Sequence, residues 1–391
     1  MHEEYRAWSS TDSSDLLLIE GKPGSGKSTL KKYFKRCLEQ SREKQIVASF
    51  HYRCQEGKQQ TNHCTMLQSL LHDILNQNEE FFFHFQPYYR QIAKHCGQLQ
   101  WTYNSLKEVL LSLAKNHSVK ERLYLIIDAV DESDDGQRYD IIEFLHELCA
   151  TKGSCNVKVF VASRPVFGLS GQSTKANKMI RLQDVNYSDI LLFASGFLGK
   201  LGLLPWGGAG PAWKCLQYIA QSAQGVFVWV RLVIKYAKRG FTKNEIFGFL
   251  KSLPTELEGL YKHILVQLER GETRDVETGK VMLQLVFYAF RPLRPEELRQ
   301  ALAMRASVDT TLSCSDESFE GELIHGIEER IISCAGSLLG INGSDGTTSP
   351  EGIIRTAWLI DRQRIALFRL RTKPFWNSSG LAAPQLRRNS T

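Results

Sequence analysis

The sequence has little that would place the protein outside the cell or in a membrane. Its 391 residues include nine cysteines but no C-x-x-C pair, a pattern typical of a reducing compartment and not of a disulfide framework. The His and Cys residues between positions 51 and 96 fit no standard zinc-finger spacing. The N-terminus lacks a signal peptide's apolar segment, and no apolar run is long enough to span a bilayer. These absences predict a cytoplasmic protein that uses neither membrane nor zinc.

Excess positive charge is also absent from most of the chain. The net charge is +7, and the segment from residue 353 to the end holds eight Lys or Arg against one acid, so residues 1–352 are neutral overall. A neutral body has no basic field with which to attract a polyanion, so nucleic acid is an unlikely partner. Contact of the basic tail with nucleic acid or a membrane surface stays open as an alternative.

The segment from Gly21 to Thr29 has the G-x-x-x-x-G-K-[ST] pattern of a phosphate-binding loop. It lies between an apolar run at residues 16–19 and a helical pattern at 29–40, and its glycines let backbone N–H groups approach a phosphate. Lys27 can reach the β- and γ-phosphates of a nucleotide, and the Ser28 hydroxyl can ligate Mg²⁺. The predicted nucleotide-binding residues are Gly21, Lys22, Pro23, Gly24, Ser25, Gly26, Lys27, Ser28 and Thr29.

Two further sites follow apolar runs at residues 123–128 and 157–163. Asp128 ends the first run and is predicted to hold Mg²⁺, directly or through water. Glu132 is the first choice to polarise an attacking water, because it follows Asp128 by four residues, and Asp131 is the alternative. Arg164 follows the second run, where a guanidinium could contact the γ-phosphate. Because parallel strands bind ligands at their carboxyl ends, these residues are expected to gather there.

Strands and helices alternate along residues 16–163, which predicts a three-layer α/β domain with a parallel sheet. Residues 1–15 are polar and are expected to form a loose lead-in, and Asn104 is a plausible cap for a helix at 104–116. From about residue 186 the pattern is helical, and after about residue 340 it loses periodicity. The predicted helices of this second half are 187–200, 212–238, 243–250, 255–270, 278–289 and 295–304.

The segments GKPGSGKSTL, LIIDAVDES and VKVFVASRP, in this order, resemble the NACHT class of signal-transducing (STAND) P-loop NTPases. The resemblance is closest to the fungal set linked to self/non-self recognition and cell death. MIRLQDVNYSDILLF, AQGVFVWVRLVI, LPTELEGLYKHIL and FYAFRPLRPEELRQAL extend it to about residue 340. It implies a sheet of the additional-strand class with helical and winged-helix-like domains after it. The implied divisions are a P-loop NTPase domain at 16–172, a helical domain at 173–275, a winged-helix-like region at 276–340 and an irregular basic tail at 341–391.

The resemblance also implies roles for individual residues. Lys27, Ser28 and Thr29 would lie at the phosphates and magnesium, and Asp128 with the Asp131/Glu132 pair would supply the Walker B acids. Arg164 would be the sensor of the γ-phosphate. The chain departs from the family in having Ala129 where Gly is common and in lacking a clear Met-His-Asp motif. No effector domain or repeat array is recognisable either. The unusual tail hints at a truncated or mispredicted gene product.

These features predict a switch that binds ATP or GTP with Mg²⁺, hydrolyses it slowly and oligomerises when activated. Partner proteins would supply the missing effector and sensor functions. Two alternatives stay open: a nucleotide-binding scaffold without turnover, and a P-loop small-molecule kinase. The loop reads phosphates and not the base, so the sequence leaves ATP and GTP undistinguished.

Overall fold

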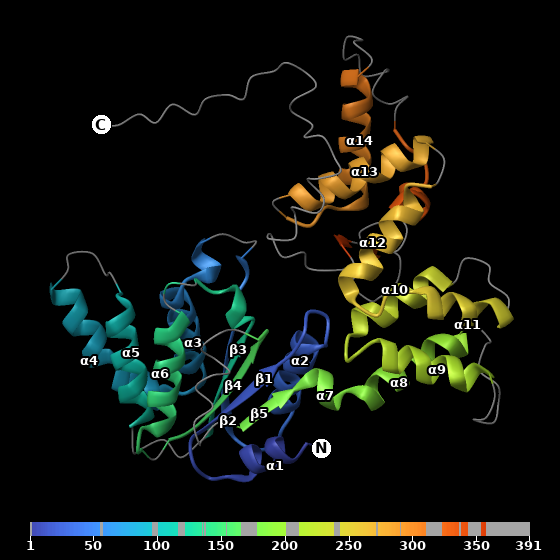
Figure 1. Cartoon of the computed structure of the whole chain (residues 1–391). Helices are drawn as coiled ribbons and strands as arrows, with labels where there is room; N and C mark the ends of the chain where they lie inside the picture. The colour runs from blue at the N-terminus through green and yellow to red at the C-terminus, as the bar shows by residue number, and fades with distance from the viewer. Residues whose placement is uncertain are drawn as a thin grey trace.

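The first half of the chain is built around a five-stranded parallel sheet (Figure 1). The computed structural model describes residues 2–54, 58–95, 101–115, 122–134, 136, 138–153, 155–165, 178–200, 211–237, 243–270, 273–289, 291–309, 323–335, 338–342 and 353–356. The strands of the sheet are β1 (Asp15–Glu20), β2 (Gln45–His51), β3 (Arg122–Asp128), β4 (Asn156–Ser163) and β5 (Lys178–Arg181).

The strand order in this sheet is β2-β3-β4-β1-β5. β4 lies between β1 and β3, and this insertion defines the additional-strand class of P-loop folds. All neighbouring strands are parallel, so their carboxyl ends share one edge; His51 pairs with Asp128, and Glu20 with Ser163. The predicted α/β fold class is confirmed.

Helices cover both faces of the sheet, which gives the three layers (Figure 1). Along β3 the faces alternate: Leu123 and Leu125 belong to one core, whereas Tyr124 and Ile126 belong to the other. Burial on both faces explains the near-continuous apolar strands. One face carries α1 (Glu3–Ser10) and α2 (Lys27–Glu39), and the other carries α3 (His63–Gln77), α5 (Tyr103–Ala114) and α6 (Arg138–Ala150), with α4 (Glu79–His95) packed on α3 and α5.

The prediction of a loose lead-in was wrong, because residues 3–10 form the helix α1, which packs on the sheet. Trp8 has no exposed surface, and its indole N–H donates to the Asp15 carbonyl oxygen at 3.1 Å. The ammonium of Lys158, itself fully buried, donates to the Trp8 carbonyl oxygen at 2.7 Å, and burial lowers the Lys158 pKa to about 8. Two aromatic residues, Tyr5 and Trp8, are too few in a polar segment to give a periodic signal, so only the folded contacts reveal this helix.

The second half is mostly helical and has its own buried core, which runs continuously from Ile190 to Ile354 among the described residues. Its helices are α7 (Leu182–Val185), α8 (Tyr187–Lys200), α9 (Pro211–Ser222), α10 (Phe227–Ala237), α11 (Lys243–Ser252), α12 (Leu257–Leu268), α13 (Thr273–Tyr288), α14 (Pro295–Asp309) and α16 (Ile327–Ala335). None of the helices in the described ranges is long and apolar enough to cross a membrane.

The last described elements are the antiparallel strands β6 (Leu339–Asn342) and β7 (Ile353–Thr356). Helices α13, α14 and α16 precede this two-stranded sheet among the described residues, and the winged-helix-like region that the resemblance implies stays a prediction. The expected irregularity from residue 341 was wrong for this stretch: Ile354 is buried, and its N–H donates to the Leu293 carbonyl oxygen at 2.7 Å. The strands are too short for sequence periodicity to reveal them. Residues 343–352 and 357–391 of the predicted tail lie outside the described residues.

Three other expectations need correction. The predicted helix 212–238 is two helices, α9 and α10, because Gln224 and Gly225 have positive φ angles of 45° and 82° and form a turn between them. Thr102, not Asn104, caps α5, through a reciprocal capping box with Ser105. β5 is a strand that the sequence pattern did not predict.

Candidate nucleotide site

The phosphate-binding loop, residues 21–26, joins the carboxyl end of β1 to α2. Gly24 and Gly26 have φ angles of 76° and 98°, a conformation that favours glycine and explains two of the motif's glycines. The Gly21 N–H donates to the Ser163 carbonyl oxygen at 3.2 Å, and this bond ties the start of the loop to the end of β4. The loop therefore lies where the sequence places it, between a buried strand and the first turn of a helix.

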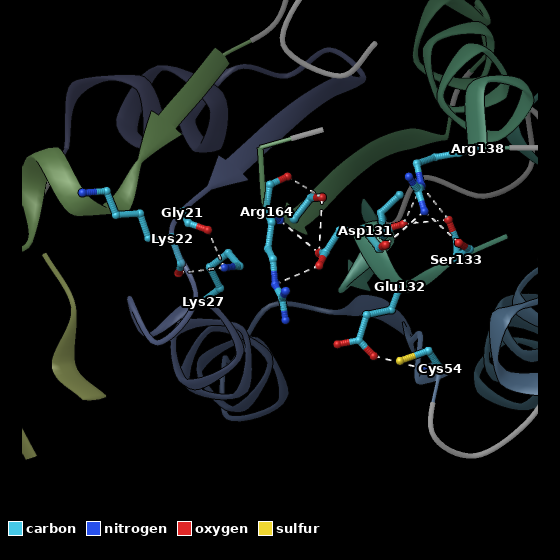
Figure 2. A network of polar contacts seen from close by, with 11 residues as sticks. Gly21, Lys22, Lys27, Cys54, Asp131, Glu132, Ser133, Arg138 and Arg164 are labelled. Atoms are coloured by element: carbon cyan, nitrogen blue, oxygen red, sulfur yellow. Dashed lines mark hydrogen bonds and ion pairs between the residues drawn. The ribbon is translucent and has the colours of Figure 1, made fainter. Parts of the chain in front are cut away.

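Lys27 begins α2 and folds back over the loop (Figure 2). Its ammonium donates to the carbonyl oxygens of Gly21 and Lys22 at 2.6 and 3.2 Å. Burial lowers the Lys27 pKa, an effect that Asp131 opposes and Arg164 reinforces. Of the other predicted loop residues, Gly21 and Ser25 are buried, Pro23, Gly24 and Gly26 are half-buried, and Lys22, Ser28 and Thr29 are exposed.

Asp128 ends β3 beside the loop, and its side chain is 2% exposed. Its carboxylate lies 3.1 Å from His51 Nδ1 and 4.0 Å from the Lys31 ammonium, and neither oxygen accepts a well-aligned hydrogen bond from the described residues. Burial would raise the Asp128 pKa, but His51, Lys31 and Ser28 outweigh it and lower the pKa. A buried, ionised carboxylate with spare acceptor capacity next to Ser28 has the donor chemistry of a Mg²⁺ ligand, so these residues fit the metal.

Asp131 and Arg164 form a close pair between β3 and β4 (Figure 2). The Arg164 Nε lies 3.1 Å from one Asp131 carboxylate oxygen, and the Arg164 backbone N–H donates to the other at 3.0 Å. The Asp131 side chain is 10% exposed, so solvent screens this pair less than a surface ion pair. Both contacts fix Arg164 at the sheet edge, on the side of the phosphate-binding loop.

Glu132 points away from this pair, toward the segment after β2 (Figure 2). One of its carboxylate oxygens accepts the Cys54 backbone N–H at 3.2 Å. Asp131 and Glu132 lie on the one-turn helix η3 (Val130–Glu132), which starts after Ala129 in a left-handed conformation with φ 59°. A methyl group at such a φ is strained, and this strain accompanies the sharp turn between Asp128 and the two acids.

Arg138, at the start of α6, forms hydrogen bonds with the backbone of this turn. We refer to residues 129–133 as the acidic loop. The Arg138 guanidinium donates to the carbonyl oxygens of Val130, Asp131 and Ser133 at 3.1, 3.0 and 2.8 Å. Because the acceptors are three backbone carbonyls, the contact fixes the path of the chain that carries both acids.

The structure thus brings Lys27, Ser28, Asp128, Asp131 and Arg164 to one edge of the sheet, with Glu132 at its margin. Sequence reasoning missed His51, Lys31 and Arg138. His51 could have been found, since it ends β2 and parallel strands align their ends. Lys31 follows Lys27 by one helical turn, which is a weaker signal. Arg138 carried no signal, because most of its acceptors in the acidic loop are backbone carbonyls.

The strand order, the loop after β1 and the acid at the end of β3 define the class: this is a P-loop NTPase-like fold with an additional-strand sheet. Residues 1–164 match the family described as Nephrocystin 3, N-terminal. Over 77% of its length the chain is 26% identical to the vegetative incompatibility protein HET-E-1 of Podospora anserina, a fungal NACHT-domain protein. The predicted resemblance to fungal NACHT proteins is confirmed. The chain spans 22% of that relative's length.

The similarity to solved structures is weaker. The Drosophila ORC, in a structure bound to DNA, is 9% identical, with a TM-score of 0.36 over 95% of this chain and 86% of that one. Cdc6p from Pyrobaculum aerophilum is 10% identical, with a TM-score of 0.34 over 91% of this chain and 88% of that one.

Proposed function

We propose that this chain is the nucleotide-dependent core of a signalling switch, which binds ATP or GTP with Mg²⁺ and hydrolyses it slowly. The observation that carries the proposal is the meeting of three strand ends. The phosphate-binding loop follows β1, Asp128 ends β3, and Arg164 follows β4, where Asp131 holds it at 3.1 Å. A cation, a metal-binding acid and a guanidinium around one loop are the groups that phosphoryl transfer requires.

Lys27 is the main phosphate-binding cation in this proposal. Its ammonium already faces the loop, where it donates to carbonyl oxygens of Gly21 and Lys22. A triphosphate in the loop would offer anionic acceptors in place of these neutral ones, and charge-assisted hydrogen bonds are the stronger kind. A nearby negative charge would also restore the Lys27 pKa that burial lowers.

The Ser28 hydroxyl and Asp128 are the groups that would hold Mg²⁺. When bound, the metal neutralises charge on the β- and γ-phosphates. His51 and Lys31 keep Asp128 ionised and oriented, so the carboxylate is ready to serve as a ligand.

Glu132 is the better candidate to activate water, and Asp131 has a different task. Asp131 makes two contacts with Arg164, and through them Asp131 orients the guanidinium toward the γ-phosphate position. Glu132 accepts a hydrogen bond from the Cys54 N–H at one carboxylate oxygen, which leaves acceptor capacity for a water molecule. These contacts support Glu132 over Asp131 as the residue that activates water.

In a switch, the bound nucleotide must change the position or the exposure of another part of the protein. We propose that this part is the helical half. We infer that a change of nucleotide alters how this half docks and favours self-association, as in signalling NTPases that use nucleotide state as a signal. The similarity to an incompatibility protein supports a role in self/non-self recognition or cell death. Partners that supply effector and sensor functions are part of this proposal, and so is a cytoplasmic location.

Titration with fluorescent ATP and GTP in the presence of Mg²⁺ tests the proposal on the full chain. Wild-type protein should bind at least one of the two, and Lys27→Ala should weaken that affinity by about 10²-fold or more, because it removes a charged donor to phosphate. Lys32→Ala, an exposed lysine on the same helix, is the matched control and should bind as wild type does. Equal affinity of folded Lys27→Ala and wild type would refute the site.

Single-turnover hydrolysis then separates the switch from its alternatives. Slow release of phosphate to water supports an NTPase, and stable binding without phosphate release favours a scaffold. Transfer of the phosphoryl group to an added small molecule would instead favour a kinase.

A further inference from the structure

Two segments of the helical half meet at the phosphate-binding loop, although they lie some 40 residues apart. Asn186 separates α7 from α8, and Gly225 lies in the turn between α9 and α10. The Asn186 side-chain amide donates to the Gly225 carbonyl oxygen at 2.8 Å and to the Ser25 carbonyl oxygen at 3.3 Å. One amide group therefore joins both helical segments to the loop.

The turn before α10 makes a second connection to the loop. The Gly24 carbonyl oxygen accepts the backbone N–H groups of Phe227 and Val228, at 2.9 and 3.4 Å. These are the first two residues of α10, whose N–H groups have no partner inside the helix. We call these contacts, made by Asn186, Phe227 and Val228, the loop–turn contact.

The buried environment of Asn186 requires a hydrogen-bond donor at this position. The residue is 4% exposed, and its side-chain oxygen has no hydrogen-bond partner among the described residues, so the polar contacts of its side chain there are the two donated bonds. Both acceptors are backbone carbonyls, which only a donor can satisfy. An acceptor in its place would face two oxygens in a buried position.

We propose that Asn186 is a positioning residue of the nucleotide site, and that the loop–turn contact couples nucleotide binding to the docking of the helical half. The inference rests on the proposed nucleotide-binding function. In a planar trans peptide the carbonyl oxygen and the next N–H point in opposite directions. A bond from Asn186 to the Ser25 oxygen therefore sets the direction of the Gly26 N–H, which belongs to the phosphate-binding motif.

Glycines on both sides of the contact allow this close approach. A Cβ on Gly24 would come within 2.7 Å of Val228 Cγ2, and a Cβ on Gly225 would come within 2.4 Å of the Gln183 Cα. A movement of the turn before α10 would therefore displace atoms that contact the phosphate-binding loop. Coupling of this kind is reciprocal: if docking of the turn favours the phosphate-binding form of the loop, a bound phosphate favours docking by the same factor.

The decisive experiment compares the full chain with Asn186→Asp, which keeps the shape of the side chain and removes its donors. Nucleotide affinity is measured with fluorescent ATP and GTP plus Mg²⁺, and amide hydrogen exchange is followed at residues 227–228 with and without nucleotide. In wild type, nucleotide should slow exchange there by about tenfold. Asn186→Asp should bind at least about tenfold more weakly and should exchange faster at 227–228 even without nucleotide.

Two controls keep the test specific. Asn62→Asp changes the exposed N-cap of α3, where the side-chain oxygen accepts the Cys64 N–H and the aspartate retains that acceptor, so affinity and exchange at 227–228 should match wild type. Amides of β4 serve as the internal reference for global unfolding. If Asn186→Asp proves unfolded by circular dichroism, Asn186→Ala, which adds no charge, takes its place with the same expectations.

The outcomes separate this inference from the function on which it rests. If neither nucleotide binds wild type, the proposed function fails, and the exchange comparison without nucleotide still decides whether Asn186 holds the turn. If wild type binds nucleotide but folded Asn186 variants bind it equally well, the positioning role is overturned. Weaker binding with unchanged exchange at 227–228 would overturn the coupling.

Discussion

The phosphate-binding loop and the acidic loop both follow strands of the same sheet edge, yet they are held in different ways. Residues 21–26 take their positive φ angles at glycines and receive hydrogen bonds from the helical half, through Asn186 and the start of α10. Residues 129–133 take theirs at Ala129 and are held by Arg138, from within the α/β half.

Under the proposed function, this difference predicts that nucleotide affinity and turnover depend on separate structural contacts. Changes in the helical half should act first on the loop that binds phosphates, and changes around α6 should act on the loop that carries the acids. A switch gains from such a division, because its domains can report nucleotide state without disturbing the chemistry. Three substitutions in the acidic loop and its support test the division, in order of decreasing effect.

Glu132→Gln should have the largest effect. It keeps the size of the side chain but removes the base, so hydrolysis should fall by about 10²-fold or more while triphosphate affinity stays near wild type. The trapped triphosphate state should then favour self-association, seen by light scattering as a larger species than with the diphosphate. Glu143→Gln, an exposed acid on α6, is the control. Wild-type turnover in Glu132→Gln would move the role to Asp131.

Arg138→Met should have an intermediate effect. The guanidinium donates to three carbonyls of the acidic loop, so its loss should lower turnover by about tenfold, with little change in the dissociation constant for the triphosphate. Arg138→Lys retains the charge and part of the donor set and should recover part of the rate. Parallel measurement of binding and single-turnover rates checks this. An equal loss of affinity and rate would contradict a role confined to the acidic loop.

Ala129→Gly should have the smallest effect. Glycine relieves the strain of φ 59°, but it loses a mostly buried methyl group and adds freedom to the unfolded chain. These terms oppose one another, so the free energy of unfolding, measured by urea titration, should change by less than about 1 kcal/mol. Gly24→Ala should be far more harmful to nucleotide binding, because its methyl would meet Val228 at 2.7 Å. If Ala129→Gly weakened nucleotide binding as much as Gly24→Ala, the proposed difference between the acidic loop and the phosphate-binding loop would be wrong.

Much of the site was predictable from the sequence because its chemistry is local. The motif Gly21–Thr29 fixes which residues can cradle a phosphate, and the apolar runs before Asp128 and Arg164 identify strand ends. Parallel topology then requires these ends to share an edge. The roles of Asp131 and Glu132 were beyond this logic, since they depend on where Arg164 and the Cys54 N–H lie.

The secondary structure of the fold was likewise only partly predictable from the sequence. Strong periodicity gave the α/β class and most helices, whereas α1, β5, the break between α9 and α10 and the strands β6 and β7 escaped it. Each of these is short, or depends on one residue such as Trp8 or Gly225 whose environment comes from a distant segment.

The sequence by itself determined the phosphate-binding loop, the acid at the end of β3 and the α/β class, because contiguous residues and regular spacing encode all three. Only the tertiary structure decided that Asp131 holds Arg164, that Arg138 supports the acidic loop and that Asn186 joins the helical half to Ser25. The physical reason is that these interactions are made between segments far apart in the chain, and two of the three end on backbone carbonyls. Every residue carries a backbone carbonyl, so no residue type in the sequence marks the partner.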